Sequence, residues 1–175
     1  CGVGLIASTE GKKSRKVVEY GINALKAVFH RGAVDADGKT GDGAGIHLEI
    51  PSDFFAEKVE ITGHKHDGSE ICVGMIFLPR NDYEAQENAR TIVESELTKS
   101  NFNIYGWRQV PVNPQVLGEK ANFTRPEITQ VLFKHNDKSL KGKDLERKLY
   151  ESRRKIEKEA IKNALDGFYI CSLSS

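Results

Sequence analysis

The sequence predicts an α+β fold in which helices cover a mixed sheet. Its predicted elements follow in the order strand, helix, strand, strand, helix, strand, strand, helix and strand. The helical segments have apolar residues every three or four positions, and the strand segments are short apolar or alternating runs bounded by Gly, Pro or Asn. Because helices that return between strands pack on the faces of a sheet, we expect an α+β or layered αββα arrangement.

The first strand and the first helix lie near the start of the chain. Residues 1–8 alternate small or polar side chains with apolar ones, which predicts a strand. Residues 14–29 are predicted as a helix, because their apolar residues recur on one face. That face consists of Val18, Ile22, Leu25 and Phe29.

A glycine-rich and aspartate-rich loop follows the first helix and leads into a second predicted strand. The loop covers residues 30–45. In the strand, Ile46, Leu48 and Ile50 point to one face, and Pro51 ends it.

The next two predicted elements are a buried strand and a helix. Residues 71–79 form an apolar run ended by Pro79. Asn81, with Glu84 three residues later, resembles a capping box that opens a helix through about Leu97.

The remaining elements are three strands and one long helix. Residues 103–112 and 128–135 are predicted strands, separated by a loop that contains Gly118. Residues 144–165 are predicted as a charged helix, and residues 168–173 as the last strand. One face of the long helix is apolar, with Leu145, Leu149, Ile156 and Ala160.

Composition indicates a single globular domain without a strongly charged partner. Of the 175 residues, 38% are apolar and 29% are charged, which is enough to bury a core. The net charge of +1 gives no reason to expect nucleic acid or an anionic membrane as a partner. No apolar run approaches the roughly 20 residues that a membrane helix needs, so we expect a cytoplasmic protein.

The three cysteines are far apart and form no CxxC pair, which argues against a disulfide framework and a zinc site. Cys72 and Cys171 lie in apolar strand-like runs, where a free cysteine usually serves as a small core residue. Cys1 differs because it opens a chain without an initial methionine. We expect either that processing exposes Cys1 and the chain is truncated after Ser175, or that the sequence is cut at both ends.

The loop of residues 30–45 fits neither of two familiar ligand-binding motifs. A phosphate loop requires GxxxxGK[ST] between a strand and a helix, whereas Gly32 and Gly38 enclose five residues and the loop runs from a helix to a strand. A calcium loop requires acidic ligands at positions one, three and five, but the fifth position from Asp35 is Lys39. A flexible turn or a specifically shaped loop remains, and its length favours the shaped loop. Positive φ angles and close contacts are expected at Gly32, Gly38, Gly41, Gly43 and Gly45.

An N-terminal Cys1 would carry a thiol and a free α-amine on one residue. A thiol has a pKa of about 8.5 and an α-amine one of about 7.7 to 8.0, so the amine can take the thiol's proton directly or through one water. Such a group attacks carboxamide or peptide carbonyls and forms a thioester. The residue alone leaves open whether Cys1 is this nucleophile or only marks where the sequence starts.

Four motifs, in order, resemble the amidotransferase domain at the N-terminus of glutamate synthase large subunits. They are CGVGLIA, HRGA with ADGKTGDGAGI, YGWRQVPVNPQVLG and FYICSLSS. This domain is a class II glutamine amidotransferase and an N-terminal-nucleophile hydrolase. The resemblance covers residues 1–175 and implies the N-terminal part of a single αββα sandwich, incomplete at the C-terminus.

The resemblance implies that Cys1 attacks the side-chain amide of L-glutamine, forms a thioester and releases ammonia. In the family, later domains of the same polypeptide use this ammonia to convert 2-oxoglutarate to glutamate. They use FMN and a 3Fe-4S iron-sulfur cluster, with ferredoxin or NAD(P)H through a small FAD-containing electron-transfer subunit as donor. No cofactor is expected in this segment, and a plant-type source would place the protein in a plastid.

The resemblance also assigns residues to the site. An Arg-Gly pair beside the N-terminal cysteine corresponds to Arg31 and Gly32, and Arg31 either favours the thiolate or anchors the loop in a salt bridge. Asp37, Lys39 and Asp42 are interpreted as residues that shape the loop.

Two parts of the family's site have no counterpart in the sequence. No asparagine is followed by glycine, so the Asn-Gly pair of the oxyanion hole is expected after Ser175. The family's segment with the arginine that binds the glutamine carboxylate begins about where Ser175 ends, so this arginine is expected there as well. This segment alone is therefore expected to be inactive. The alternatives are another class II amidotransferase, or a non-catalytic binding domain in which the N-terminal cysteine is an artefact.

Overall fold

The computed structural model describes residues 2–175, which form two compact units. The loop unit consists of residues 2–49 and Asn113–Arg125. The sheet unit consists of Ile50–Val112 and Pro126–Ser175. No helix within residues 2–175 is both long enough and apolar enough to cross a membrane.

The sheet unit contains a four-stranded sheet with the strand order β2-β3-β1-β4. Its strands are β1 (Cys72–Leu78), β2 (Phe102–Gln109), β3 (Glu127–His135) and β4 (Tyr169–Ser174). Each strand is antiparallel to its neighbours, so the expectation of a mixed sheet is wrong. The four strands predicted from the apolar runs are all present.

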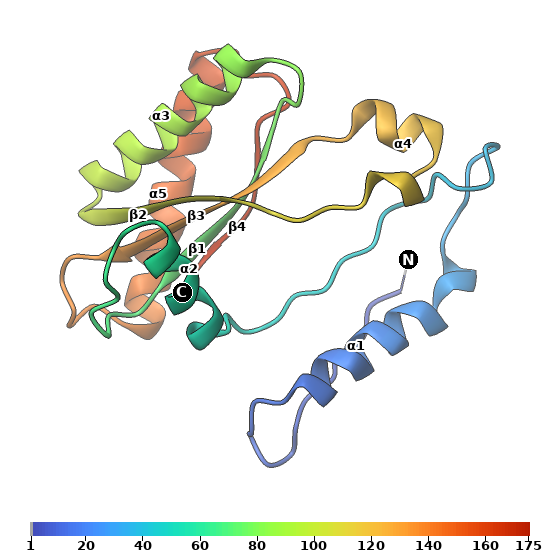
Figure 1. Ribbon diagram of the computed structural model, residues 1–175, viewed down its shortest axis with the longest axis horizontal. Coiled ribbons are helices and arrows are strands. Elements are labelled where there is room, and N and C mark those ends of the chain that lie inside the picture. Colours follow the sequence, from blue (N-terminus) through green and yellow to red (C-terminus); the bar gives the residue numbers. More distant parts are fainter. Residues whose placement is uncertain (1) are drawn as a thin grey trace. The chain divides into compact units, whose positions relative to one another are not determined.

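The topology explains why no parallel neighbours occur. Helix α3 (Tyr83–Lys99) connects β1 to β2, and helix α5 (Gly142–Lys162) connects β3 to β4. The connection from β1 to β2 passes over β3, and the connection from β3 to β4 passes over β1, so the two β-α-β units interleave. Figure 1 shows α3 and α5 side by side on one face of the sheet.

An apolar core fills the space between these two helices and the sheet. All four residues of the predicted apolar face of the long helix are buried, because 3.6-residue periodicity directs them to the same side. The rings of Phe102 and Phe133 meet edge to face with centroids 5.2 Å apart. Other fully buried members of the core include Cys72, Ile76, Leu78, Val93, Leu97 and Val131.

The opposite face of the sheet carries a smaller apolar cluster beneath helix α2 (Ser52–Ile61). Phe55 and Val59 of α2 pack with Val73 and Leu132 of the sheet. Helix α2 was not predicted from the sequence, because only these two of its side chains are buried and its apolar stripe is correspondingly narrow. Its start does carry a recognisable signal, a proline followed by Ser-Asp in the first turn.

The helix ends differ from the predicted ends by a few residues. Asp82 caps α3, because its Oδ1 accepts a hydrogen bond of 2.9 Å from the Ala85 amide. The predicted cap at Asn81 is therefore wrong by one position. The long helix ends at Lys162 because Ala164 and Gly167 adopt positive φ angles of 50° and 79°, which a helix cannot accommodate.

The loop unit contains helix α1 (Arg15–Ala27), which confirms the first predicted helix. The Ser14 hydroxyl caps α1 by accepting a hydrogen bond of 3.1 Å from the Lys16 amide. A 3₁₀ turn, η1 (Phe29–Arg31), follows directly. The later segment of the unit contains the short elements η2 (Pro114–Val116) and α4 (Glu119–Thr124), neither of which was predicted.

The two strands predicted in the loop unit are wrong. Residues 2–8 and 45–50 have no strand structure, and Val3 and Leu5 are 102% and 89% exposed. Alternation of side chains indicates which face of a strand would be buried, but a strand also needs a neighbour for its backbone hydrogen bonds. Within the described part of this unit, the bridge between Val34 and Gly41 is the only strand-type pairing.

Candidate functional site

The described chain begins beside the C-terminal end of α1. A Cβ atom placed on Gly2 would lie 3.4 Å from Cγ2 of Val28, so the backbone of Gly2 contacts that side chain closely. Val28 is the C-cap residue of α1. The predicted nucleophile, Cys1, lies outside the described residues.

The turn η1 holds Arg31 and Gly32 close to Val28. The Arg31 amide donates to the Val28 carbonyl at 2.8 Å, and the Gly32 amide donates to the Phe29 carbonyl at 3.0 Å. Val28 therefore contacts the beginning of the described chain and also carries the turn with both predicted site residues. Arg31 is exposed and makes no salt bridge with any of residues 2–175.

Directly after Gly32, Ala33–Asp42 form a closed loop, here called the 33–42 loop. The Ala33 amide donates to Oδ2 of Asp42 at 2.9 Å, and the Asp35 amide donates to the Thr40 carbonyl at 2.7 Å. At its tip, Gly38 has a φ angle of 69°, a left-handed conformation that glycine adopts without steric cost. These hydrogen bonds confirm that the segment is a shaped loop.

Asp37 organises the tip of the 33–42 loop. Its Oδ1 accepts hydrogen bonds from the amides of Lys39 and Thr40, at 2.9 and 2.7 Å, and its Oδ2 accepts one from the Thr40 hydroxyl. Hydrogen bonds hold the pKa of the Asp37 carboxyl well below its ordinary value. The Thr40 hydroxyl contributes most, followed by the amides of Thr40, Lys39 and Glu119. Asp37 and Asp42 therefore shape the loop as predicted, whereas Lys39 takes part through its amide.

The segment Asn113–Arg125 packs against the tip of this loop. Lys120 Nζ donates to both carboxylate oxygens of Asp35, at 3.0 and 2.8 Å. A Cβ atom on Gly118 would lie 2.5 Å from the Thr40 nitrogen and closer still to the Thr40 hydroxyl and the Asp37 carboxylate. This contact was not predicted from the sequence, because no spacing rule connects residues about 80 positions apart, and the glycine itself was the only signal.

The other two thiols lie in the sheet unit. Cys72 is buried, and burial, with Glu70 and Glu146 adding to it, raises the pKa of its thiol far above the ordinary value. A buried thiol with a raised pKa is a poor nucleophile. Cys171 is exposed on β4, so its predicted role as a core residue is wrong. The physical reason is the irregular pairing of β4 with β1, which leaves Ile170 and Leu173 as its buried apolar residues.

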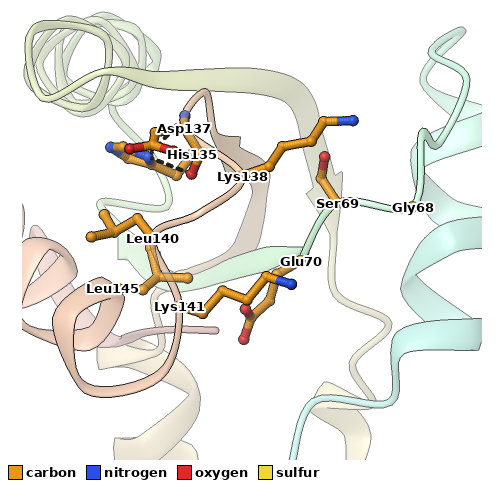
Figure 2. A pocket seen from close by; sticks show the side chains of 9 residues that line it. All are labelled: Gly68, Ser69, Glu70, His135, Asp137, Lys138, Leu140, Lys141 and Leu145. Atoms are coloured by element: carbon orange, nitrogen blue, oxygen red, sulfur yellow. Dashed lines mark hydrogen bonds between the residues drawn. The ribbon is translucent and has the colours of Figure 1, made fainter.

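A pocket of about 260 Å³ lies in the sheet unit and contains none of the predicted site residues. Figure 2 shows His135 joined to Asp137, whose amide donates to the His135 ring at 3.1 Å. Lys138, on the pocket wall, is ion-paired with Asp67 at 3.0 Å. Two acidic and two basic side chains line the pocket, so their formal charges balance. The lining residues are Gly68, Ser69, Glu70, His135, Asp137, Lys138, Leu140, Lys141 and Leu145.

Comparison with known proteins identifies the family. All of residues 1–175 match the model of the family described as "Glutamine amidotransferases class-II". The chain belongs to the class II glutamine amidotransferases. Membership of this family also confirms the predicted α+β fold class. The helices and the antiparallel sheet of the structure agree with it.

Several similar relatives of this amidotransferase segment are glutamate synthases. The chain is 54% identical over 175 residues to the glutamate synthase [NADPH] large chain of Azospirillum brasilense, with 100% of this chain and 12% of the relative aligned. It is 38% identical to ferredoxin-dependent glutamate synthase 2 of Synechocystis sp., over 99% of this chain and 11% of the relative. It is also 38% identical to the chloroplastic ferredoxin-dependent glutamate synthase of Spinacia oleracea, over 100% of this chain and 11% of the relative. The chain thus spans about one eighth of these relatives' length or less.

Proposed function

We propose that residues 1–175 are the N-terminal part of the glutaminase domain of a glutamate synthase large chain, with Cys1 as the nucleophile. The observation that carries the proposal is the family match over residues 1–175, to which the 54% identity with a glutamate synthase large chain adds. The contact between Gly2 and Val28 supports the choice of residues, because it brings the start of the described chain to the turn that holds Arg31 and Gly32.

The proposed reaction begins when the α-amine of Cys1 takes the thiol proton, directly or through one water. The thiolate attacks the side-chain carbonyl carbon of glutamine, and the resulting tetrahedral intermediate loses ammonia after the protonated amine returns its proton to the leaving nitrogen. A water molecule then hydrolyses the glutamyl thioester and releases glutamate. Thiol and amine have similar ordinary pKa values, about 8.5 and about 7.7 to 8.0, so proton exchange between them is easy.

Arg31 and Gly32 have supporting roles in this proposal. The positive charge of Arg31 favours the thiolate over the neutral thiol. Gly32 leaves space beside the turn, since it has no side chain. The donors that stabilise the oxyanion and the group that binds the glutamine carboxylate belong to other parts of the full-length protein.

The released ammonia is proposed to serve later domains of the same polypeptide in the reductive amination of 2-oxoglutarate to glutamate. FMN and an iron-sulfur cluster would act in those domains, with ferredoxin or NAD(P)H as electron donor. The residues described here do not fit such a cluster, because no three His, Cys, Asp or Glu side chains within residues 2–175 are placed to hold a metal ion together. We further propose a location in the cytoplasm, or in a plastid as named for the relative from Spinacia oleracea.

Covalent labelling of the full-length protein tests the assignment of Cys1. A glutamine analogue with a diazoketone in place of the side-chain amide should alkylate one thiol and abolish glutamine hydrolysis, and peptide mass spectrometry should locate the adduct on Cys1. Because Cys171 is exposed, the Cys171→Ser variant serves as the matched control and should be labelled and inactivated at the wild-type rate. Inactivation with the adduct on Cys171 or elsewhere would overturn the proposal.

A further inference from the structure

We propose that Gly118 and Lys120 are positioning residues for the glutaminase reaction, which hold the 33–42 loop and thereby fix the positions of Arg31 and Gly32, the two residues proposed to assist the nucleophile. The inference rests on the proposed function. It concerns a segment that is far from Cys1 in the sequence and shares no motif with it. All residues involved belong to the loop unit.

Arg31 and Gly32 lie between two regular parts of the loop unit. On one side, the hydrogen bonds of Arg31 and Gly32 to Val28 and Phe29 join them to the end of α1. On the other side, Ala33 begins the closed 33–42 loop through its bond to Asp42. The positions of Arg31 and Gly32 therefore depend on the loop as well as on the helix.

Polar contacts, rather than an apolar core, hold the 33–42 loop. No residue of α1 and none of residues 33–42 is buried within the described part of the chain. The loop is instead contacted by Lys120, which forms an ion pair with Asp35 at 2.8 Å, and by Gly118, which lies close to Asp37 and Thr40. Loss of these contacts would release the loop tip.

Gly118 is the more sensitive of the two positions. Its φ angle is −68°, so any residue can adopt its backbone conformation, and the requirement for glycine is one of space. A methyl group there would lie 2.5 Å from the Thr40 nitrogen, a backbone atom that cannot turn aside. The Lys120–Asp35 pair is more exposed and contributes less, since exposed ion pairs are weak.

The test compares Gly118→Ala with Gly45→Ala in the full-length protein. Gly45 is a matched control, because a Cβ atom there meets nothing within 4 Å and its φ angle is not positive. Displacing a group that orients the nucleophile reduces turnover steeply, so Gly118→Ala should lower kcat for glutamine about tenfold or more with KM within about twofold. Gly45→Ala should keep both constants within about twofold of wild type.

Charge variants at Lys120 give a second, independent readout. Lys120→Met should lower kcat by about twofold to threefold, in keeping with an exposed ion pair, and Lys120→Arg should restore it. If Gly118→Ala does not accumulate as folded protein, the difference in kcat between Lys120→Met and Lys120→Arg tests the inference instead. In each variant, glutamate formation from 2-oxoglutarate and added ammonia at the wild-type rate shows that the rest of the enzyme is intact.

Wild-type kcat in both Gly118→Ala and Lys120→Met would overturn the inference, as would an equal loss in Gly45→Ala. A change in KM alone would also overturn it, because the loop would then act on glutamine binding. These outcomes are separable from failure of the proposed function. If Cys1 of the unaltered protein is not alkylated by the glutamine analogue, the function fails; if it is alkylated but the variants behave as wild type, only this inference fails.

Discussion

The two units of this chain hold their structure in different ways. In the sheet unit, continuous apolar strands and two long helices enclose a core whose central residues, such as Ile76, Val131 and Phe133, are fully buried. In the loop unit, α1 has no buried residue, and the 33–42 loop is closed by carboxylate and backbone hydrogen bonds. The predicted site residues that the structure describes, Arg31 and Gly32, both lie in the loop unit.

The comparison indicates that the loop unit, which contains the proposed site residues, depends on polar geometry, whereas the sheet unit depends on buried area. Buried area tolerates small displacements, but hydrogen bonds and close contacts weaken when atoms move by a fraction of an ångström. Mutations in the two units should therefore have different consequences. A core mutation should lower stability, and a loop mutation should lower activity with little loss of stability.

The largest expected effect is in the core of the sheet unit. Phe133→Ala removes a fully buried ring that packs on Phe102. The free energy of unfolding of this unit should fall by about 3–5 kcal/mol. Hydrogen exchange of β1 and β3 peptides in the full-length protein measures the change, and exchange rates within about twofold of wild type would contradict the assignment of this core.

Replacing residues 113–125 with a short Gly-Ser turn should remove one segment of the loop unit and leave the sheet unit intact. Gln109 and Thr129 are cross-strand neighbours on β2 and β3, and the Val110 amide donates to the Ile128 carbonyl at 3.0 Å, so a short turn can close this hairpin. The sheet unit should keep its hydrogen-exchange protection, whereas glutamine hydrolysis should fall by about 10²-fold because the partner of the 33–42 loop is lost.

The opposite result, in which the sheet unit loses its hydrogen-exchange protection and glutamine hydrolysis is unchanged, would contradict the comparison. A control replacement confined to the exposed turn Asn136–Ser139, outside the loop unit, should leave glutamine hydrolysis unchanged. This control separates loss of the loop's partner from a general effect of altered turns.

A smaller effect is expected from Asp37→Asn. The amide side chain keeps an acceptor oxygen but loses the negative charge that strengthens the bonds from Lys39, Thr40 and the Thr40 hydroxyl. Amide exchange at Lys39 and Thr40 should become several-fold faster, while peptides from β1 and β3 remain unchanged. Unchanged exchange in the loop would show that Asp37 does not organise it.

The smallest effect is an acid dependence confined to the loop. Because hydrogen bonds lower the pKa of Asp37 below its ordinary value of 3.8, the ionised carboxylate stabilises the closed loop. This contribution is fully present above the ordinary pKa and is lost as pH falls through the lower pKa of the closed loop. Loop protection, corrected for intrinsic exchange, should therefore be constant from neutral pH to about pH 5 and fall at lower pH, and Asp37→Asn should remove this fall.

The sequence predicted the sheet unit better than the loop unit for a physical reason. The apolar runs around Ile76 and Val131, and the apolar face with Leu149 and Ile156, become buried through patterns that are local in the sequence. Residues 2–8 and 45–50 have the alternation of strands, but strand formation also requires a partner, which no local pattern specifies. Helix α2 was missed because it buries only Phe55 and Val59.

The candidate site was predicted by a different kind of information. Arg31 and Gly32 were identified by resemblance to a family, and the structure places them beside the residue that Gly2 contacts. The contacts of Gly118 and Lys120 join segments about 80 residues apart, so neither periodicity nor motif spacing could reveal them. Gly118 has an ordinary φ angle, so its requirement for glycine comes from the close contact with Thr40. Only the three-dimensional structure reveals that contact.

The most direct test of the central claim is to compare two nitrogen sources in the full-length Cys1→Ala variant. If Cys1 releases ammonia from glutamine, the variant should lose glutamate formation from glutamine plus 2-oxoglutarate, yet retain it when an ammonium salt replaces glutamine. The Cys171→Ser control should use both nitrogen sources as wild type does. Glutamine-dependent synthesis at the wild-type rate in Cys1→Ala would contradict the account.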